Sequence, residues 1–480
     1  MKSKISWLFS ILVAIQAGIW VVYTRQCHFY WDDYPLLFWM STRPFREMVF
    51  TGFLWGDQNY RPVLPVIHRI QLQLFGFNAW LYYLMNIAVI FIGLFFAWKS
   101  HRFLFRNISA PVFYCFALLP VFFLSFVHIS NLILFFGFMF FSISLYLFLR
   151  YLKTAKWVYL MISSAFFFLA LSTKEMFILM PLAFIAYDIL FTLHQDRQYR
   201  FTLKKCAVYF VFFIPLFLYL GIRLFALRDV GGYEFYYHRQ FTTYLRYLFI
   251  EPFILLNISY FFPFSWLEAI LKLLAFSLIV CYRPSGKTGP VILLLFFCLV
   301  LVSLPEWPIK ALHYELPVTV LPRNPVISFG EASSARYWFM PAFYLYVIAL
   351  YLLSRQPLTR RNIILVFCGL LLIFNLHTSI RSLQDFAWQS DYFRNYYRAI
   401  DQSLQKKLSD ENEADTLIYL ANPARFYRKP EGEAMFHALA GLYMEGSPFW
   451  KNVVLDRSQA QYLVVVDKNF EVIFLRDLPD

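Results

Sequence analysis

The feature that most constrains this chain is a recurring apolar window, separated from the next window by a short basic cluster. Each window is about 20 residues long, which is the length a helix needs to cross the hydrocarbon core of a bilayer. The composition agrees, because the chain is 60% hydrophobic and only 15% charged, with 58 Phe. Soluble domains carry about 25% charged residues. The sequence therefore predicts an integral membrane protein.

The windows predict an all-α polytopic protein with about eleven membrane-spanning helices. They lie at 5–24, 80–98, 111–128, 131–149, 157–173, 176–193, 206–225, 264–282, 289–304, 337–354 and 362–378. A further apolar stretch, 241–263, is interrupted by Glu251, Pro252 and Pro263. We interpret that stretch as an interfacial or re-entrant helix on the outer face.

The basic clusters fix the expected orientation. With the N-terminus inside, every inner connection is basic, whereas the short outer connections near 129 and 174 carry one Lys between them. Inner connections rich in Lys and Arg are the usual rule. We therefore expect a cytoplasmic N-terminus and a periplasmic C-terminus, in a bacterial inner membrane. The same rule accounts for the net charge of +14, with attraction to membrane lipids as a second effect. It leaves no reason to expect a nucleic-acid partner.

Two parts are expected: a transmembrane domain over 1–378 and a small extramembrane α/β domain over 379–480. The first has three long outer loops, at 25–79, 226–263 and 305–336, and long loops in compact proteins are usually functional. In the second, 381–400 is typical of an amphipathic helix. Segments 416–420 and 462–466 are typical of strands, and 472–475 could pair with the latter.

An acidic pair, Asp32 and Asp33, follows the first span within aromatic surroundings. Two like charges in an apolar setting raise the pKa of one carboxyl group, which makes it a usable general base. The alternative is structural, because Asp33 before Tyr34 and Pro35 would also suit the start of a helix.

Further charges are expected at the same outer boundary. Lys174 and Glu175 lie between two apolar windows, and Arg336 is the last charge before another. Ionisable residues near a membrane interior indicate function by default, and cations there would suit a lipid-linked phosphate. The alternatives are a neutralised pair for Lys174 and Glu175, and plain interfacial anchors for Arg336 and Arg61.

At these positions the sequence resembles the membrane-embedded GT-C glycosyltransferases that use polyprenyl-phosphate sugars, above all the tetratricopeptide-containing O-mannosyltransferases and their bacterial relatives. Six short motifs in order carry the resemblance: Trp31-Asp32-Asp33; Trp55-Gly56 with Tyr60-Arg61-Pro62; Tyr82-Tyr83-Leu84-Met85-Asn86; Ser172-Thr173-Lys174-Glu175 with Pro181 and Asp188; Tyr219-Leu220-Gly221-Ile222-Arg223; and Arg336-Tyr337-Trp338-Phe339-Met340-Pro341. The family usually has His where Tyr83 stands, and no tetratricopeptide repeats follow.

The resemblance implies a GT-C fold and a hexosyltransferase, a mannosyltransferase among the options, acting on the non-cytoplasmic face. The donor would be a polyprenyl-phosphate sugar, and the acceptor a hydroxyl of a glycan, lipid or protein. It implies Asp32 as the catalytic base, with Asp33 as the alternative, and Lys174 and Arg336 as phosphate ligands. Residues assigned with them to substrate binding are Tyr60, Arg61, Glu175, Arg223 and Tyr337.

Two other functions are alternatives to a glycosyltransferase. A transporter or flippase for a lipid-linked glycan would need polar or broken helices near the bilayer centre, and Lys272 is the main exception in otherwise apolar centres. A non-catalytic scaffold is the third reading. Metal dependence stays open, because some relatives of this fold use a divalent cation and others do not.

Overall fold

In the computed structural model of the protein, the described residues are 2–30, 33–50, 60–105, 108–119, 129, 132–195, 199–227, 288–304, 329–410, 417–420, 431–454, 457–466 and 472–475. The expected span at 264–282, the re-entrant stretch at 241–263 and most of the loops at 226–263 and 305–336 lie outside these residues. So does most of the second half of the expected span at 111–128.

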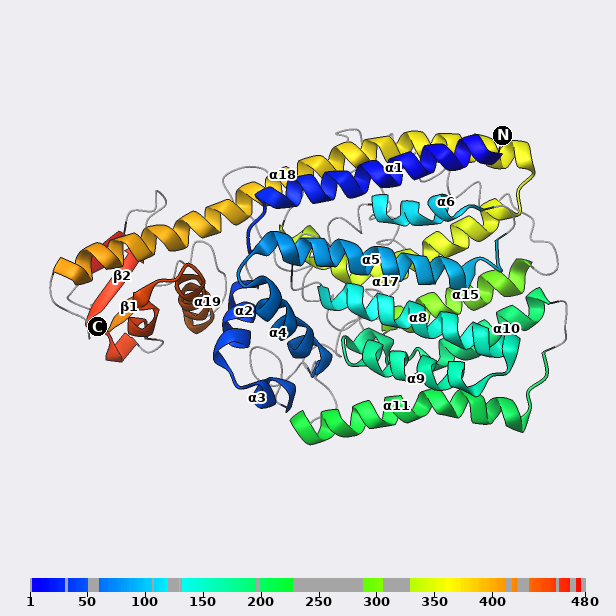
Figure 1. The fold of residues 1–480 in the computed structure, drawn as a ribbon, viewed down its shortest axis with the longest axis horizontal. Coiled ribbons are helices and arrows are strands. Elements are labelled where there is room, and N and C mark those ends of the chain that lie inside the picture. The colour runs from blue at the N-terminus through cyan, green and yellow to red at the C-terminus, as the bar shows by residue number, and fades with distance from the viewer. Residues whose placement is uncertain are drawn as a thin grey trace, which may run out of the picture.

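Long apolar helices form a layered bundle (Figure 1). Its members are α1 (Lys2–Tyr23), α5 (Ala79–His101), α8 (Leu132–Thr154), α9 (Trp157–Leu171), α10 (Pro181–His194), α11 (Leu203–Leu227), α15 (Thr288–Ser303) and α17 (Phe329–Ser354). Two short elements, α6 (Ala110–Tyr114) and the 3-10 helix η2 (Cys115–Leu118), lie beside α1. The helix predicted to begin at 337 begins at Phe329, so the last residues of the outer loop expected at 305–336 are helical. The physical reason is that Glu331, Ala332 and Ala335 favour helix and no Pro interrupts this stretch.

Among the described helices, four are long and apolar enough to cross a membrane: Ser6–Gln26, Ala79–His101, Leu132–Thr154 and Leu203–Ala226. Four shorter apolar helices accompany them, at Trp157–Leu171, Pro181–His194, Thr288–Ser303 and Phe339–Ser354. Large apolar side chains on α11, such as Phe210, Phe217 and Phe225, are exposed. These features indicate an integral membrane protein, whereas the count of eleven spans stays a prediction.

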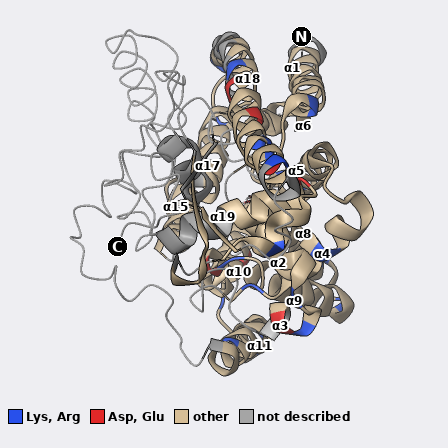
Figure 2. Cartoon of the chain, turned by 90° about the vertical axis from the view of Figure 1, so that its left-hand side faces the viewer, with Lys and Arg blue, Asp and Glu red and all other residues tan. Residues whose placement is uncertain are grey.

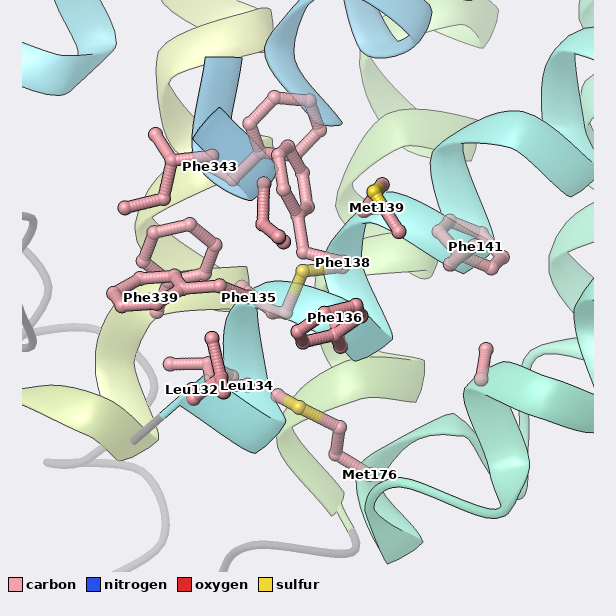
Figure 3. Close-up of a cluster of buried hydrophobic side chains, with 14 of the residues drawn as sticks. Leu132, Leu134, Phe135, Phe136, Phe138, Met139, Phe141, Met176, Phe339 and Phe343 are labelled. Carbon is pink, nitrogen blue, oxygen red and sulfur yellow. The ribbon is translucent and has the colours of Figure 1, made fainter. Parts of the chain in front are cut away.

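Aromatic packing fills the core between α8 and α17 (Figure 3). The ring of Phe138 on α8 lies edge-on to Phe339 and Phe343 on α17, with centroids 5.2 and 5.1 Å apart. Such edge-to-face pairs add about 0.5–1.5 kcal/mol beyond the burial of their area. The many Phe side chains thus stabilise the packing of the bundle helices against one another.

The first outer loop is itself helical where the structure describes it. It contains α2 (Asp33–Thr42), α3 (Phe45–Phe50) and α4 (Val63–Phe75). These helices lie between the bundle and the C-terminal elements (Figure 1). The long loop expected at 25–79 is therefore a set of short helices that pack at one end of the bundle.

The last long helix, α18, runs without a break from Leu358 to Asp410. Its 53 residues correspond to about 80 Å, far more than the about 30 Å of a hydrocarbon core. The sequence predicted a span at 362–378 and a separate amphipathic helix at 381–400, and this separation is wrong because no Pro or Gly falls between 370 and 410. Along its length α18 carries bands of both charges, whereas the bundle is mostly uncharged (Figure 2).

The C-terminal elements are α19 (Glu431–Met444) and a small sheet. Strand β2 (Tyr462–Val466) is central, with β1 (Ile418–Leu420) parallel to it and β3 (Val472–Leu475) antiparallel. The expected strands, and the pairing of 472–475 with 462–466, are confirmed. The division into domains at 378 and 379 stays a prediction, and it falls inside α18.

Candidate active site

Two arginines from distant parts of the chain converge on one glutamate. Arg61 Nη2 lies 3.0 Å and Arg61 Nε 3.3 Å from Glu175 Oε2. On the other side, Arg223 Nη1 lies 3.3 Å from Glu175 Oε1. Each carboxylate oxygen therefore faces its own guanidinium group, and charge-assisted hydrogen bonds of this kind are the strong ones.

Tyr60 and Tyr219 complete what we call the cation cluster, which consists of Tyr60, Arg61, Glu175, Tyr219 and Arg223. The Tyr219 hydroxyl donates to the Tyr60 carbonyl oxygen at 3.0 Å and accepts from Arg223 Nη1 at 3.2 Å. Tyr219 and Arg223 are four residues apart on α11, so they share one face of that helix. The cluster thus joins the residues just before α4, the turn after α9 and the C-terminal end of α11.

The turn that carries Lys174 and Glu175 lies between two short helices, α9 and α10. Helices α9 and α10 have 15 and 14 residues, or about 22 and 21 Å, which is less than the about 30 Å of a hydrocarbon core. Irregular backbone within a bilayer is tolerated only where protein covers it. Ser172, Thr173, Lys174 and Glu175 are all buried accordingly, at 0, 0, 4 and 8% exposure.

A glycine on α8 lets this turn lie close to the bundle. A Cβ atom on Gly137 would lie 2.5 Å from Thr173 Oγ1 and 2.6 Å from a ring carbon of Phe177. Any side chain at 137 would therefore displace the two residues that flank Lys174 and Glu175. The tight approach places the recessed turn with little freedom.

Electrostatics keep Glu175 ionised. Burial raises the pKa of its carboxyl group, but the charges of Arg61 and Arg223 and the hydrogen bonds it accepts hold the pKa below the ordinary value. With Lys174 beside it, three cations and one anion give these four side chains a formal charge of +2. A buried site with excess positive charge suits a phosphate group.

The acidic pair lies at the start of α2. Asp32 falls outside the described residues. Asp33 is fully buried, and its Oδ2 accepts a hydrogen bond from the backbone N–H of Tyr30 at 3.1 Å. The Asp33 N–H donates in return to the Tyr30 carbonyl at 2.9 Å. Asp33 is thus the first residue of α2, and this contact runs back to the loop before the helix rather than forward to the N–H groups that an N-cap side chain binds.

The structure brings some sequence-predicted site residues together and leaves others unplaced. Tyr60, Arg61, Glu175 and Arg223 meet in the cation cluster, with Lys174 in the adjoining turn. Arg336 and Tyr337 lie in the first part of α17, residues 329–338, where the structure describes the backbone only. The Arg61 side chain is only 15% exposed and forms an ion pair with Glu175.

Sequence reasoning did not assign Tyr219 to the site, although its motif was recognised. Its spacing of four residues from Arg223 on an apolar helix was the available signal. The contact between His28 and Arg394, described below, had no such signal, because 366 residues separate them. Among the described residues, no group of three or more His, Cys, Asp or Glu side chains could hold a metal ion.

Residues 59–220 match the family model of the dolichyl-phosphate-mannose-protein mannosyltransferases. This part of the chain is therefore similar to that family, in line with the resemblance of the motifs, and it contains Tyr60, Arg61, Lys174, Glu175 and Tyr219. No curated protein matches the chain.

Several solved structures are similar to the chain. One is ArnT from Cupriavidus metallidurans bound to undecaprenyl phosphate, at 13% identity and a TM-score of 0.48, over 96% of this chain and 93% of that one. Another is the apo oligosaccharyltransferase of Archaeoglobus fulgidus, at 13% identity and a TM-score of 0.46, over 90% of this chain and 63% of that one. A third is AglB of the same organism with an inhibitory peptide and a dolichol-phosphate, at 12% identity and a TM-score of 0.41, over 98% and 75% of the two chains.

Proposed function

We propose that this protein is a membrane glycosyltransferase that moves a sugar from a polyprenyl-phosphate donor to an acceptor hydroxyl on the non-cytoplasmic face. The observation that carries the proposal is the cation cluster, most of which lies within the segment matched by the mannosyltransferase family model. A binding site for a lipid-linked phosphate needs buried cations at membrane depth, and this cluster supplies them.

The donor phosphate would lie against Lys174 and the outward side of Arg61 and Arg223, with Arg336 and Tyr337 completing the site from α17. Glu175 would then serve as the internal counter-ion that keeps both guanidinium groups oriented before the donor arrives. Preorganised cations stabilise the charge that grows on a leaving phosphate without further rearrangement. Tyr219 contacts Arg223 directly, and the carbonyl oxygen of Tyr60 accepts from the Tyr219 hydroxyl.

Asp32 would act as the general base, with Asp33 fixing the start of α2 beside it. The carboxylate takes the proton of the acceptor hydroxyl while the acceptor oxygen attacks the anomeric carbon of the sugar. The bond between that carbon and the phosphate oxygen breaks, and its electron pair leaves with the polyprenyl phosphate. The proton remains on the carboxyl group. A positioned base of this kind contributes about 10²–10⁴-fold in rate.

The test is a two-part comparison. Purified protein with polyprenyl-phosphate hexoses should release polyprenyl phosphate only when an acceptor is supplied, and mass spectrometry of cell-envelope glycans and glycoproteins from a deletion strain should show a product lacking one hexose. Loss of a lipid-linked glycan from the outer leaflet, with no hexose missing from any product and no release in vitro, would favour the transport alternative instead.

A further inference from the structure

The residues before and after the acidic pair contact one stripe of α18. We call the stripe Phe386, Ser390, Phe393, Arg394 and Tyr397, whose spacing of 4, 3, 1 and 3 places them on a single face of the helix. They lie beyond the part of α18 expected to span the membrane. No motif in the sequence links these loop residues to α18, so the contacts become visible only in the folded structure.

Polar contacts hold the loop before the pair. The backbone N–H of His28 donates to Ser390 Oγ at 3.0 Å. The His28 ring Nε2 lies 3.0 Å from Arg394 Nη1 and 3.2 Å from Asp391 Oδ1. His28 is thus fixed at both its backbone and its ring by one turn of α18.

Aromatic contacts hold both flanks. The Tyr30 ring lies edge-on to Phe386 and Phe393, with centroids 5.2 Å away in each case. Beyond the pair, the Tyr34 ring lies edge-on to Tyr397 at 4.9 Å. Tyr30 and Tyr34, four residues apart in the sequence, therefore hold Asp33 between two contacts to the same face of α18.

Arg394 also connects this loop to α19. Its Nε lies 3.7 Å from Glu445 Oε1, and Glu445 Oε2 accepts from Arg398 Nε at 2.8 Å. Glu445 directly follows α19. A Cβ atom on Gly441 of α19 would lie 2.4 Å from the Tyr397 ring, so α19 is seated directly on the stripe. Helix α19 also contacts α2, because the Phe38 ring of α2 lies edge-on to the Tyr443 ring of α19, with centroids 5.2 Å apart.

We infer that Arg394 is a positioning residue for transfer, which acts through His28 to hold the loop that leads into α2 and carries the acidic pair. The inference rests on the proposed function for its catalytic consequence, but its structural part does not. Misplacing a reacting group by about 1 Å can cost about 10²-fold in rate. An arginine that touches neither donor nor acceptor can therefore control turnover.

The chain supplies a matched control. Arg394 and Arg398 both contact Glu445, but among the contacts described above only Arg394 reaches His28. Arg394→Ala should lower kcat by roughly tenfold to a hundredfold and change the donor KM by less than about twofold. Arg398→Ala should leave kcat within about threefold of the unchanged protein. Arg394→Lys keeps the charge but loses the fork, so it should restore kcat only in part.

Hydrogen exchange of the peptide over 27–42 provides a readout without donor. Arg394→Ala should speed exchange of the Asp33 amide by about tenfold or more, because that amide donates within the held loop. Arg398→Ala should leave it near the unchanged rate. Equal exchange and equal kcat in the two alanine variants would overturn the inference. Absence of transfer by the unchanged protein would overturn the proposed function alone, because the exchange result would still decide whether Arg394 positions the loop.

Discussion

The cation cluster and the acidic loop, of which the structure describes residues 27–30 and 33–34, both depend on contacts between distant segments, yet they are held in different ways. The cluster is held by ionic contacts in which each oxygen of Glu175 faces one arginine. The loop is held by rings and by single polar contacts along one face of α18. The cluster is therefore sensitive to the loss of one charge, whereas the loop is sensitive to small displacements. A donor site needs fixed charge, and a base needs fixed position.

The largest effect on stability should come from removing the carboxylate at the centre of the cluster. Glu175→Ala leaves two guanidinium groups buried beside each other, and breaking a buried ion pair in this way costs about 3–5 kcal/mol. Thermal unfolding in detergent measures it. Glu47→Ala is the control, because the Arg43–Glu47 pair is half exposed and such pairs contribute about 0–1 kcal/mol. Similar losses in both variants would show that the cluster is no more than a surface pair.

A smaller loss should follow from crowding the recessed turn. Gly137→Ala places a methyl group within 2.5 Å of Thr173 Oγ1, and overpacking of this kind costs about 1–3 kcal/mol. Donor affinity should fall as well, because Lys174 and Glu175 follow Thr173. Gly221→Ala, near Arg223 on α11, meets nothing within 4 Å and should be neutral or stabilising by up to about 1 kcal/mol. Unchanged donor affinity in Gly137→Ala would separate the turn from the donor site.

Crowding the loop should have the opposite signature. Gly441→Ala pushes on the Tyr397 ring, which lies against Tyr34. We expect kcat to fall by roughly tenfold while donor KM stays within about twofold. Gly289→Ala, which also meets nothing within 4 Å, is the control in steady-state kinetics. A change in KM without a change in kcat would place α19 at the donor rather than at the base.

The smallest effect concerns pH. Burial and the neighbouring Arg394 lower the pKa of His28, against the opposing effects of Asp391 and Glu445, and Arg398 adds to the lowering. A group whose folded pKa is lower than its unfolded pKa of about 6.5 binds more protons when unfolded, so stability falls as pH drops below about 6.5. Unfolding midpoints between pH 7.5 and 5 should therefore decline less in His28→Asn. Parallel declines would show that His28 is not coupled to folding.

The sequence predicted the fold class, the C-terminal strands and most members of the cluster, because each has a local signal. Apolar windows mark spans, a continuous Val-rich run marks the strand at 462–466, and charges in apolar surroundings mark Arg61, Glu175 and Arg223. It could not predict that α18 continues past 378, since a polar amphipathic stretch is compatible with either a new helix or an extension. Nor could it predict that Arg394 meets His28, because a contact across 366 residues leaves no trace in local pattern.

If the cation cluster binds the donor and the acidic loop performs the transfer, one kinetic comparison separates the two roles most directly. Transfer and donor binding are measured for Asp32→Asn and Arg223→Lys with the same polyprenyl-phosphate sugar. The account predicts that Asp32→Asn lowers kcat by about 10²–10⁴-fold with donor Kd unchanged, and that Arg223→Lys weakens donor binding because Lys lacks the fork. Near-normal turnover in both Asp32→Asn and Asp33→Asn, or unaltered donor Kd in Arg223→Lys, would contradict it.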